Sequence, residues 1–209
     1  MLFDNDTGKT MKLFGSLTSP YVRKARLVLL EKNIRHECLI GAEKSEILSV
    51  NPLGRIPALI LDDGFCVFDS TVIAEYADTL NDAPILIPRT DTRARLRVKR
   101  WEALADGIMD SAIVVRNERM RPLEQQNATT LATHNKAVTE AVDYASQLLG
   151  ERQWCEGEAI TLADLALVSA LIYLDLRQAE RDWRSTHQNL AVWFSKVSAL
   201  PSVIASSVA

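Results

Sequence analysis

The first third of the chain alternates between short apolar segments and a segment with helical spacing. Residues 11–15 (MKLFG) and 35–40 predict strands. Between them, apolar residues of 21–32 recur three and four positions apart, which predicts an amphipathic helix. Ser19 offers this helix an N-cap, and Pro20 suits its first position, where the missing N–H costs nothing. The chain therefore begins as strand, helix, strand.

The same pattern continues with a short helix, a hairpin and a further helix. In chain order these are a helix over 43–50, an apolar strand over 58–61, a returning strand over 65–68 and a helix over about 72–80. Asp62-Asp63-Gly64 separates the two strands and is typical of a hairpin turn. Asp69-Ser70-Thr71 offers caps for the last helix. This order predicts a small α/β domain over 11–80.

The rest of the chain predicts helices and no strand. Residues 81–90 hold two prolines and predict a linker. Helical patterns follow over 91–120, 129–149, 162–176 and 190–199. We therefore expect an all-helical bundle over 91–209, and a structureless N-terminal extension over residues 1–10.

A sharp local motif opens the most apolar of these helices. Thr161-Leu162-Ala163-Asp164 is a capping box, in which the side chains of Thr161 and Asp164 each satisfy the other's backbone N–H. Ile160 and Leu165 stand at the positions of a hydrophobic staple. The helix that follows is apolar nearly all round, which predicts a buried central helix and a structural role for the motif.

Composition restricts the function. The chain has 209 residues, 47% of them hydrophobic, and a formal charge of −3, which suits a globular protein and not a general nucleic-acid binder. Three cysteines cannot all pair, and no CxxC or clustered histidine predicts a metal site. Residues 1–10 do not resemble a secretory signal, and no apolar run is long enough to span a bilayer. We expect a soluble, cytoplasmic protein without metal, nucleic acid or membrane.

Four motifs, in this order, resemble the cytosolic glutathione transferases. They are Ser19-Pro20-Tyr21, the segment from Asn51-Pro52 to Ile56-Pro57-Ala58-Leu59, Asp69-Ser70, and the Thr161–Asp164 box. The run GSLTSPYVRKAR is especially similar to a bacterial serine-type subgroup of that family. The resemblance implies an N-terminal thioredoxin-like domain (βαβ-α-ββα) that binds glutathione, followed by a helical bundle.

The resemblance also implies how glutathione is activated. A free thiol has a pKa of about 8.5, so only a few per cent is the nucleophilic thiolate at pH 7. A hydroxyl at a helix N-terminus can stabilise that anion by a hydrogen bond and by the oriented N–H groups. Ser19 occupies this place, with Thr18 and Ser16 as alternatives on the same loop. A cysteine is absent there, which argues against protein-thiol redox catalysis.

The same resemblance assigns binding residues for glutathione. Pro57 is expected to follow a cis peptide bond, which turns the N–H and C=O of Ile56 toward the glutathione backbone. Ser70 is expected to bind the γ-glutamyl carboxylate at a helix N-terminus, with Asp69 near the γ-glutamyl ammonium. Candidates for the glycyl carboxylate are Lys44 and Arg55.

For the second substrate, the resemblance points to the long helix after the linker. The residues there that are expected to face it are Asp106, Asp110, Ile113 and Arg116. The basic cluster at the start of this helix favours a solvated face or a subunit contact. Cys38 and Cys66 are expected to be buried apolar residues of strands.

The expected function is conjugation of glutathione, as co-substrate, to a small electrophilic apolar compound, as in detoxification. A homodimer is expected by resemblance. The alternative is a non-catalytic member of the same fold that serves as a regulatory or partner-binding module, and glutathione-dependent peroxidase or isomerase chemistry is a lesser one. Ser19, Pro57 and Ser70 together favour the transferase, because a partner-binding scaffold does not need all three.

Overall fold

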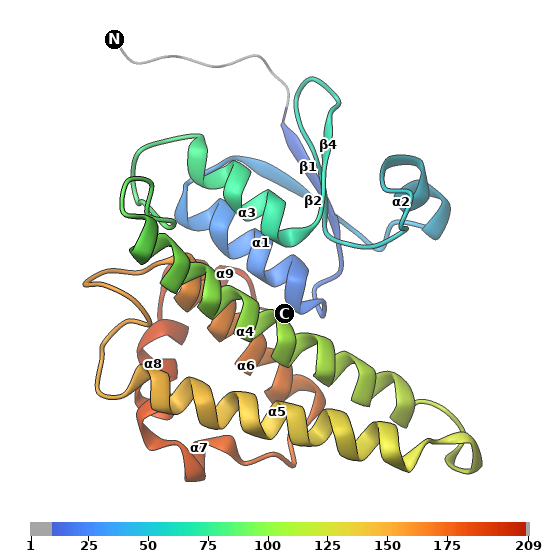
Figure 1. Cartoon of the computed structure of the whole chain (residues 1–209). Coiled ribbons are helices and arrows are strands. Elements are labelled where there is room, and N and C mark those ends of the chain that lie inside the picture. The colour runs from blue at the N-terminus through green and yellow to red at the C-terminus, as the bar shows by residue number, and fades with distance from the viewer. Residues whose placement is uncertain (1–9, 208–209) are drawn as a thin grey trace. The chain divides into compact units, whose positions relative to one another are not determined.

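The structure is a computed structural model, and it describes residues 10–207 (Figure 1). Of the expected extension over 1–10, all but Thr10 lies outside the described residues. Contacts divide the chain into two compact units, one ending at Pro84 and the other running over Ile85–Ser207. This division falls within the segment 81–90.

The first unit is built on a mixed four-stranded sheet in the order β2-β1-β3-β4. Its strands are β1 (Met11–Gly15), β2 (His36–Ile40), β3 (Ala58–Ile60) and β4 (Cys66–Val67). β1 runs parallel to β2 and antiparallel to β3, and β4 is antiparallel to β3. The helices are α1 (Pro20–Glu31), α2 (Lys44–Val50) and α3 (Ser70–Thr79). α1 and α3 pack against each other, and α2 lies apart from them (Figure 1).

The hairpin between β3 and β4 forms as its turn residues predict. Gly64 has φ +91°, in the region that favours glycine, and its N–H donates to the Leu61 carbonyl over 2.9 Å. The Asp63 carboxylate accepts from the Phe65 N–H over 2.8 Å. These local bonds fix the register in which Leu59 lies opposite Val67.

The cysteines Cys38 and Cys66 correct one expectation. Both are half-buried rather than buried. The reason is the strand order, because β2 and β4 are the two outer strands of the sheet and have a neighbour on one side only. Burial is still sufficient to raise the pKa of the Cys66 thiol.

Two lysines, one in α1 and one directly after it, take part in the interior of the first unit. Lys32 follows the helix and is fully buried. Its ammonium donates to the carbonyls of Asn81 (2.9 Å) and Pro84 (2.7 Å), and it lies 3.4 Å from the Asp78 carboxylate. Lys24 is also buried, and its Nζ reaches the Thr71 hydroxyl over 3.4 Å. These lysines join α1 to α3 and to the segment that follows α3.

The second unit is helical. Its elements are α4 (Thr92–Arg119), the 3₁₀ turn η1 (Leu123–Gln125), α5 (Ala128–Leu149), α6 (Leu162–Arg177), α7 (Trp183–Thr186), α8 (Gln188–Ser198) and α9 (Pro201–Ala205). α4 packs most extensively on α6 and α5, and α6 is buried along most of its length. The short elements η1, α7 and α9 are too brief to produce a periodic pattern, so they were not predicted. The four-stranded sheet with helices and the helical second part confirm the predicted fold class.

The predicted capping box at Thr161 is present. The Asp164 carboxylate, which is fully buried, accepts from the Thr161 N–H over 2.9 Å and from the Thr161 hydroxyl over 3.1 Å. It also accepts from the Cys155 N–H (2.8 Å) and from Trp193 Nε1–H (3.1 Å), two donors outside the motif. Asp164 therefore joins the start of α6 to the preceding loop and to α8.

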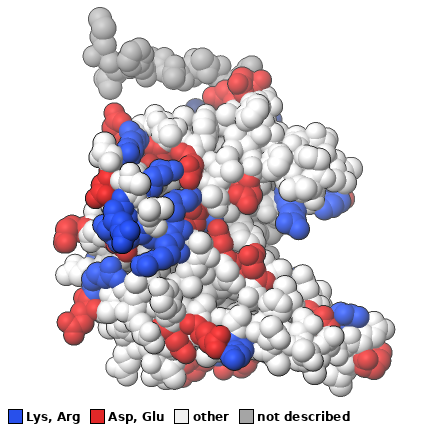
Figure 2. All heavy atoms as spheres, viewed as in Figure 1, with Lys and Arg blue, Asp and Glu red and all other residues white. Residues whose placement is uncertain are grey.

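Figure 2 shows Lys and Arg gathered over the first half of α4. Its basic residues there are Arg93, Arg95, Arg97, Lys99 and Arg100. The cluster is partly neutralised within the second unit, because Arg97 pairs with Glu156 at 3.1 Å and Lys99 pairs with the buried Glu102.

Among residues 10–207, no helix is long and apolar enough to cross a membrane.

Candidate functional site

Three of the expected glutathione-binding segments emerge at one edge of the sheet. Phe14, near the end of β1, lies opposite Ala58 at the start of β3. Leu59 in turn lies opposite Val67, the last residue of β4. The loop 16–19 after β1, Ile56-Pro57 before β3 and Asp69-Ser70 after β4 therefore share this edge, which we call the Ser19 sheet edge. The loop after β2, which leads to α2, starts there too, because Gly15 pairs with Ile40.

Ser19 is the N-cap of α1, as predicted, and Pro20 is its first residue. Its hydroxyl oxygen accepts from the Val22 N–H over 3.4 Å, longer than the usual 2.7–3.2 Å. The hydroxyl itself donates to no residue that the structure describes. The Ser19 O–H is therefore available to a ligand at the helix N-terminus. Thr18 is exposed and Ser16 half-buried on the same turn, so both alternatives remain open.

The peptide bond between Ile56 and Pro57 is cis, as the resemblance implied. Within the described part of the chain, neither the N–H nor the C=O of Ile56 has a hydrogen-bond partner. Pairing between β1 and β3 begins only at Ala58. The half-buried Ile56 thus presents an unpaired donor and acceptor beside the Ser19 sheet edge, as an added strand would require.

Asn51 organises the turn before Ile56, a role that was not predicted. It is 1% exposed, and its Nδ2 donates to the Arg55 carbonyl over 2.8 Å. Its Oδ1 accepts from the Leu53 N–H over 3.0 Å, and its carbonyl accepts from the Gly54 N–H over 2.8 Å. The sequence signal for this role was the Asn51-Pro52 pair at the start of a proline-rich turn, because asparagine side chains often bond the backbone of turns.

Asp69 and Ser70 open α3. Asp69 is the N-cap, and its carboxylate accepts from the Thr71 N–H over 3.0 Å. Ser70 is only 3% exposed, yet its hydroxyl and its N–H have no partner among residues 10–207. An anion at this position would meet two free donors at a helix N-terminus.

Lys44 and Arg55 are both exposed, on the elements that flank the Asn51 turn. The Lys44 ammonium donates to the carbonyl of Gly54, next to Arg55 in the chain. Gly54 has φ +58°, and a side chain added there would meet Lys44 Nζ at 2.5 Å. The structure therefore brings Lys44 to the turn that carries Arg55, with its ammonium engaged by a backbone oxygen.

The residues expected to face a second substrate all lie on α4, in the second unit. Asp106, Ile113 and Arg116 are half-buried, and Asp110 is exposed. Thr161 and Asp164 have the structural role that was expected for them. No cluster of His, Cys, Asp and Glu within the described residues could hold a metal ion.

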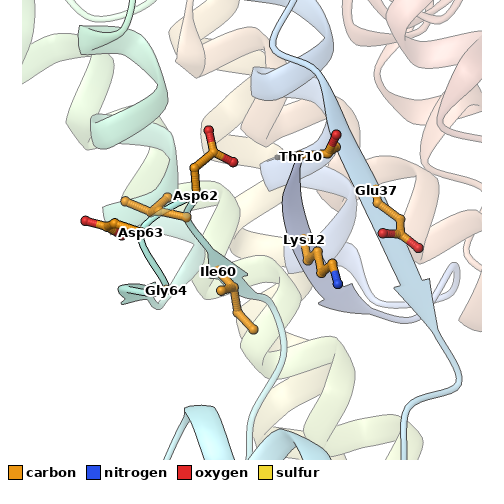
Figure 3. Close-up of a pocket in the computed structure, with 8 residues that line it drawn as sticks. Thr10, Lys12, Glu37, Ile60, Asp62, Asp63 and Gly64 are labelled. Atoms are coloured by element: carbon orange, nitrogen blue, oxygen red, sulfur yellow. The ribbon is translucent and has the colours of Figure 1, made fainter. Parts of the chain in front are cut away.

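A depression in the first unit lies elsewhere. It measures about 630 Å³ and is lined by Thr10, Lys12, Glu37, Ile60, Leu61, Asp62, Asp63 and Gly64. Figure 3 shows Lys12 and Glu37 on neighbouring strands, with Asp62 and Asp63 on the hairpin. These residues lie where β1 begins and β3 ends, at the sheet edge opposite to Ser19 and Ser70. None of the predicted glutathione-binding residues lines this depression.

Comparison with known proteins places both parts of the chain in one family. Residues 18–80 match the model of the glutathione S-transferase N-terminal domain, and residues 122–195 match that of the C-terminal domain. The GST-like protein YibF of Escherichia coli, which is uncharacterized, is 38% identical over 177 residues, covering 83% of this chain and 86% of YibF.

Two solved structures are similar over 96% of this chain and 100% of their own. One is a glutathione S-transferase from Methylobacillus flagellatus with glutathione bound (37% identity, TM-score 0.92). The other is a glutathione transferase family member from Pseudomonas fluorescens with bound S-(propanoic acid)-glutathione (33% identity, TM-score 0.85). Together with the two domain matches, these similarities show that the chain belongs to the glutathione S-transferase family.

Proposed function

We propose that this protein binds glutathione at the Ser19 sheet edge, stabilises the glutathione thiolate through the Ser19 hydroxyl and transfers glutathione to a small electrophile. The observation that carries the proposal is the set of unused polar groups at this edge: the Ser19 O–H, the Ile56 backbone and the Ser70 amide and hydroxyl. The glutathione-bound relative supports glutathione as the ligand. The first unit is then the glutathione-binding domain and the second the helical domain.

Each free group matches one part of glutathione. The Ile56 N–H and C=O can pair with the backbone of its cysteine, as an added strand would. The Ser70 donors can take the γ-glutamyl carboxylate, with the Asp69 carboxylate near the γ-glutamyl ammonium. Lys44 and Arg55 are the cations for the glycyl carboxylate. To bind it, the Lys44 ammonium would give up its hydrogen bond to the Gly54 carbonyl.

The energy available at Ser19 is sufficient for activation. A hydrogen bond to an ionised acceptor contributes about 1.5–3 kcal/mol. The N-terminus of α1 adds about 0.3–1 kcal/mol for a nearby anion. Their sum corresponds to a fall of about 1.5–3 pKa units, since one unit equals about 1.4 kcal/mol. The glutathione thiol would then ionise near neutral pH or below it.

The test is the apparent thiol pKa of bound glutathione in Ser19→Ala, with Thr18→Ala and Ser16→Ala as matched controls from the same loop. We expect Ser19→Ala to return this pKa toward about 8.5 and to slow conjugation of a model electrophile, while both controls behave as the parent. The assignment to Ser19 would be refuted if the thiol pKa stayed low in Ser19→Ala, or if it returned toward the free value in Thr18→Ala instead. Glutathione binding without any fall in the pKa would support a non-catalytic binding protein.

We further propose that the protein acts as a homodimer in the cytoplasm. This proposal rests on membership of the family and on no contact in the structure. Sedimentation equilibrium at micromolar concentration should give about twice the chain mass of 23.3 kDa. A species at the mass of one chain would contradict the dimer.

A further inference from the structure

A pocket of about 350 Å³ lies within the helical unit, between α5 and the segment from α6 to α8 that includes α7 (Figure 1). We call it the α5–α7 pocket. Its volume is at the lower end of the range of about 300–1,000 Å³ that small-molecule sites occupy. None of the residues that line it belongs to the predicted glutathione or second-substrate sites. The lining residues that carry the argument are Val142 and Asp143 of α5, and Arg181, Asp182, Trp183 and His187 of the facing segment.

Arg181 supplies a cation to this pocket. Neutral acceptors hold its guanidinium in place, because Nε donates to Gln178 Oε1 over 2.9 Å and Nη2 donates to Asn135 Oδ1 over 3.1 Å. Nη1 donates to Thr139 Oγ1 over 2.6 Å and carries a second N–H that has no acceptor among the described residues.

The charge of Arg181 has no carboxylate partner. Among residues 10–207 it forms no ion pair, unlike Arg119 and Arg184, which pair with Glu180 and Asp175. Burial lowers the pKa of Arg181, because the guanidinium is partly removed from water. A fixed and partly desolvated guanidinium of this kind is suited to bind a carboxylate.

Two carboxylates, those of Asp143 and Asp182, also line the pocket. Asp143 Oδ1 lies 2.8 Å from His187 Nε2, and Asp182 Oδ1 accepts from the Ser185 N–H over 3.2 Å. The second oxygen of each carboxylate has no hydrogen-bond partner within the described part of the chain. Each aspartate is therefore held in place by one oxygen and keeps the other for a ligand.

The order of these groups along α5 separates the cation from a carboxylate by one helical turn. Thr139, which bonds Arg181, precedes Asp143 by four residues, or about 6 Å along the helix axis. A ligand with only a negative charge would meet two carboxylates, and a ligand with only a positive charge would meet the guanidinium. The charges of the pocket are therefore complementary to a small ligand that carries both an anionic and a cationic group.

The pocket also has an apolar part. Val142 and Trp183 line it and are each only 2% exposed. The indole of Trp183 is fixed, because its Nε1–H donates to Asp175 over 2.9 Å and the Arg184 guanidinium carbon lies 4.2 Å from the ring centre. An aliphatic group of a ligand can be buried against these two side chains, which favours a ligand larger than the charged groups alone.

We propose that the α5–α7 pocket binds a small aliphatic α-amino acid as its zwitterion. Arg181 binds the carboxylate of the amino acid. Asp143 and Asp182 accept hydrogen bonds from its ammonium group, and its aliphatic side chain lies against Val142 and Trp183. This site goes beyond the proposed transferase function and does not rest on it, because every residue of the pocket belongs to the second unit and every predicted glutathione-binding residue to the first.

The experiment is calorimetric titration of the full chain with L-leucine at neutral pH in the absence of glutathione. Three analogues each remove one feature of leucine: 4-methylpentanoate lacks the ammonium group, 3-methylbutylamine lacks the carboxylate, and glycine lacks the aliphatic side chain. We expect saturable binding of leucine and at least tenfold weaker binding of each analogue.

Variants of the charged groups assign the binding to this pocket. Arg181→Gln should weaken leucine binding by tenfold or more. Asp143→Asn and Asp182→Asn should each weaken it by about fivefold, and both keep an oxygen that can accept from His187 or cap α7. The matched control is Glu140→Gln, one turn from Asn135–Lys136 on α5, because Glu140 is exposed, pairs with Lys136 and does not line the pocket. This control should change the affinity by less than twofold.

Several results would overturn the proposal. They are no leucine binding to the parent protein, equal binding of either singly charged analogue or of glycine, or unchanged affinity in the folded Asp143→Asn and Asp182→Asn variants. Circular dichroism shows which variants are folded, and the two asparagine variants keep the test valid if Arg181→Gln is not. A repeat with glutathione present should give the same leucine affinity, whether or not glutathione binds. Displacement of leucine by glutathione would place leucine in the first unit and would also overturn the proposal.

Discussion

Replacement of Asp164 by alanine should be among the most damaging single changes in the helical unit. The carboxylate is fully buried and accepts hydrogen bonds from Thr161, Cys155 and Trp193. Alanine leaves the Cys155 N–H and Trp193 Nε1–H buried without an acceptor, at a cost of about 1–3 kcal/mol each. Loss of the cap at the start of α6 adds about 1 kcal/mol. We therefore expect a loss of about 3–7 kcal/mol, a large part of the roughly 5–15 kcal/mol that holds a domain folded.

The matched control is Asn127→Ala, which removes the N-cap of α5 in the same unit. Asn127 is exposed, and its side chain accepts only from the Thr130 N–H, over 3.0 Å. Water can replace this bond, so we expect a loss of about 1 kcal/mol. Urea unfolding followed by far-ultraviolet circular dichroism measures both variants against the parent. If Asp164→Ala loses no more stability than Asn127→Ala, the reasoning about the buried donors is refuted. Asp164→Asn keeps one acceptor oxygen, so its loss of stability should lie between those of Asp164→Ala and Asn127→Ala.

Three other predictions address single contacts. Lys32→Met should destabilise the first unit by about 3–5 kcal/mol in urea unfolding, because it breaks a buried ion pair with Asp78 and removes the donor to the carbonyls of Asn81 and Pro84; a loss below about 1 kcal/mol would contradict this. Asn51→Ala should weaken glutathione binding several-fold in calorimetry, because the turn before Ile56 loses two side-chain hydrogen bonds; an unchanged affinity would show that the turn holds its shape without them. Glu180→Ala should alter the unfolding free energy by less than about 1 kcal/mol, because its ion pair with Arg119 is exposed to solvent, and a larger loss would count against that assessment.

The local parts of the fold could be predicted from the sequence because their causes are local. Ser19-Pro20 at the start of α1, Asp62-Asp63-Gly64 in the hairpin and the Thr161–Asp164 box each act over a few residues. The partners of Lys32 and Asp164 could not be predicted in this way. Asn81, Pro84 and Trp193 lie 29 or more residues away along the chain and meet them only through tertiary packing.

The candidate site was predicted unevenly for the same reason. The family resemblance pointed to Ser19, Ile56 and Ser70 as candidates, and the strand register explains why their segments share one sheet edge. The packing of α4 on α6 was not predicted, because α6 has the apolar pattern of a core helix on nearly all of its faces. A contact between two helices leaves no periodic signal in the sequence of either helix.

The most direct test of the central claim is an ultraviolet difference titration of the protein with glutathione, which follows thiolate absorbance from about pH 5 to pH 9 and spans the free-thiol pKa of about 8.5. The hydrogen bond from Ser19 and the N-terminus of α1 predict a thiolate that forms with an apparent pKa of about 5.5–7. A thiolate that forms only near pH 8.5, or the absence of glutathione binding, would contradict the account.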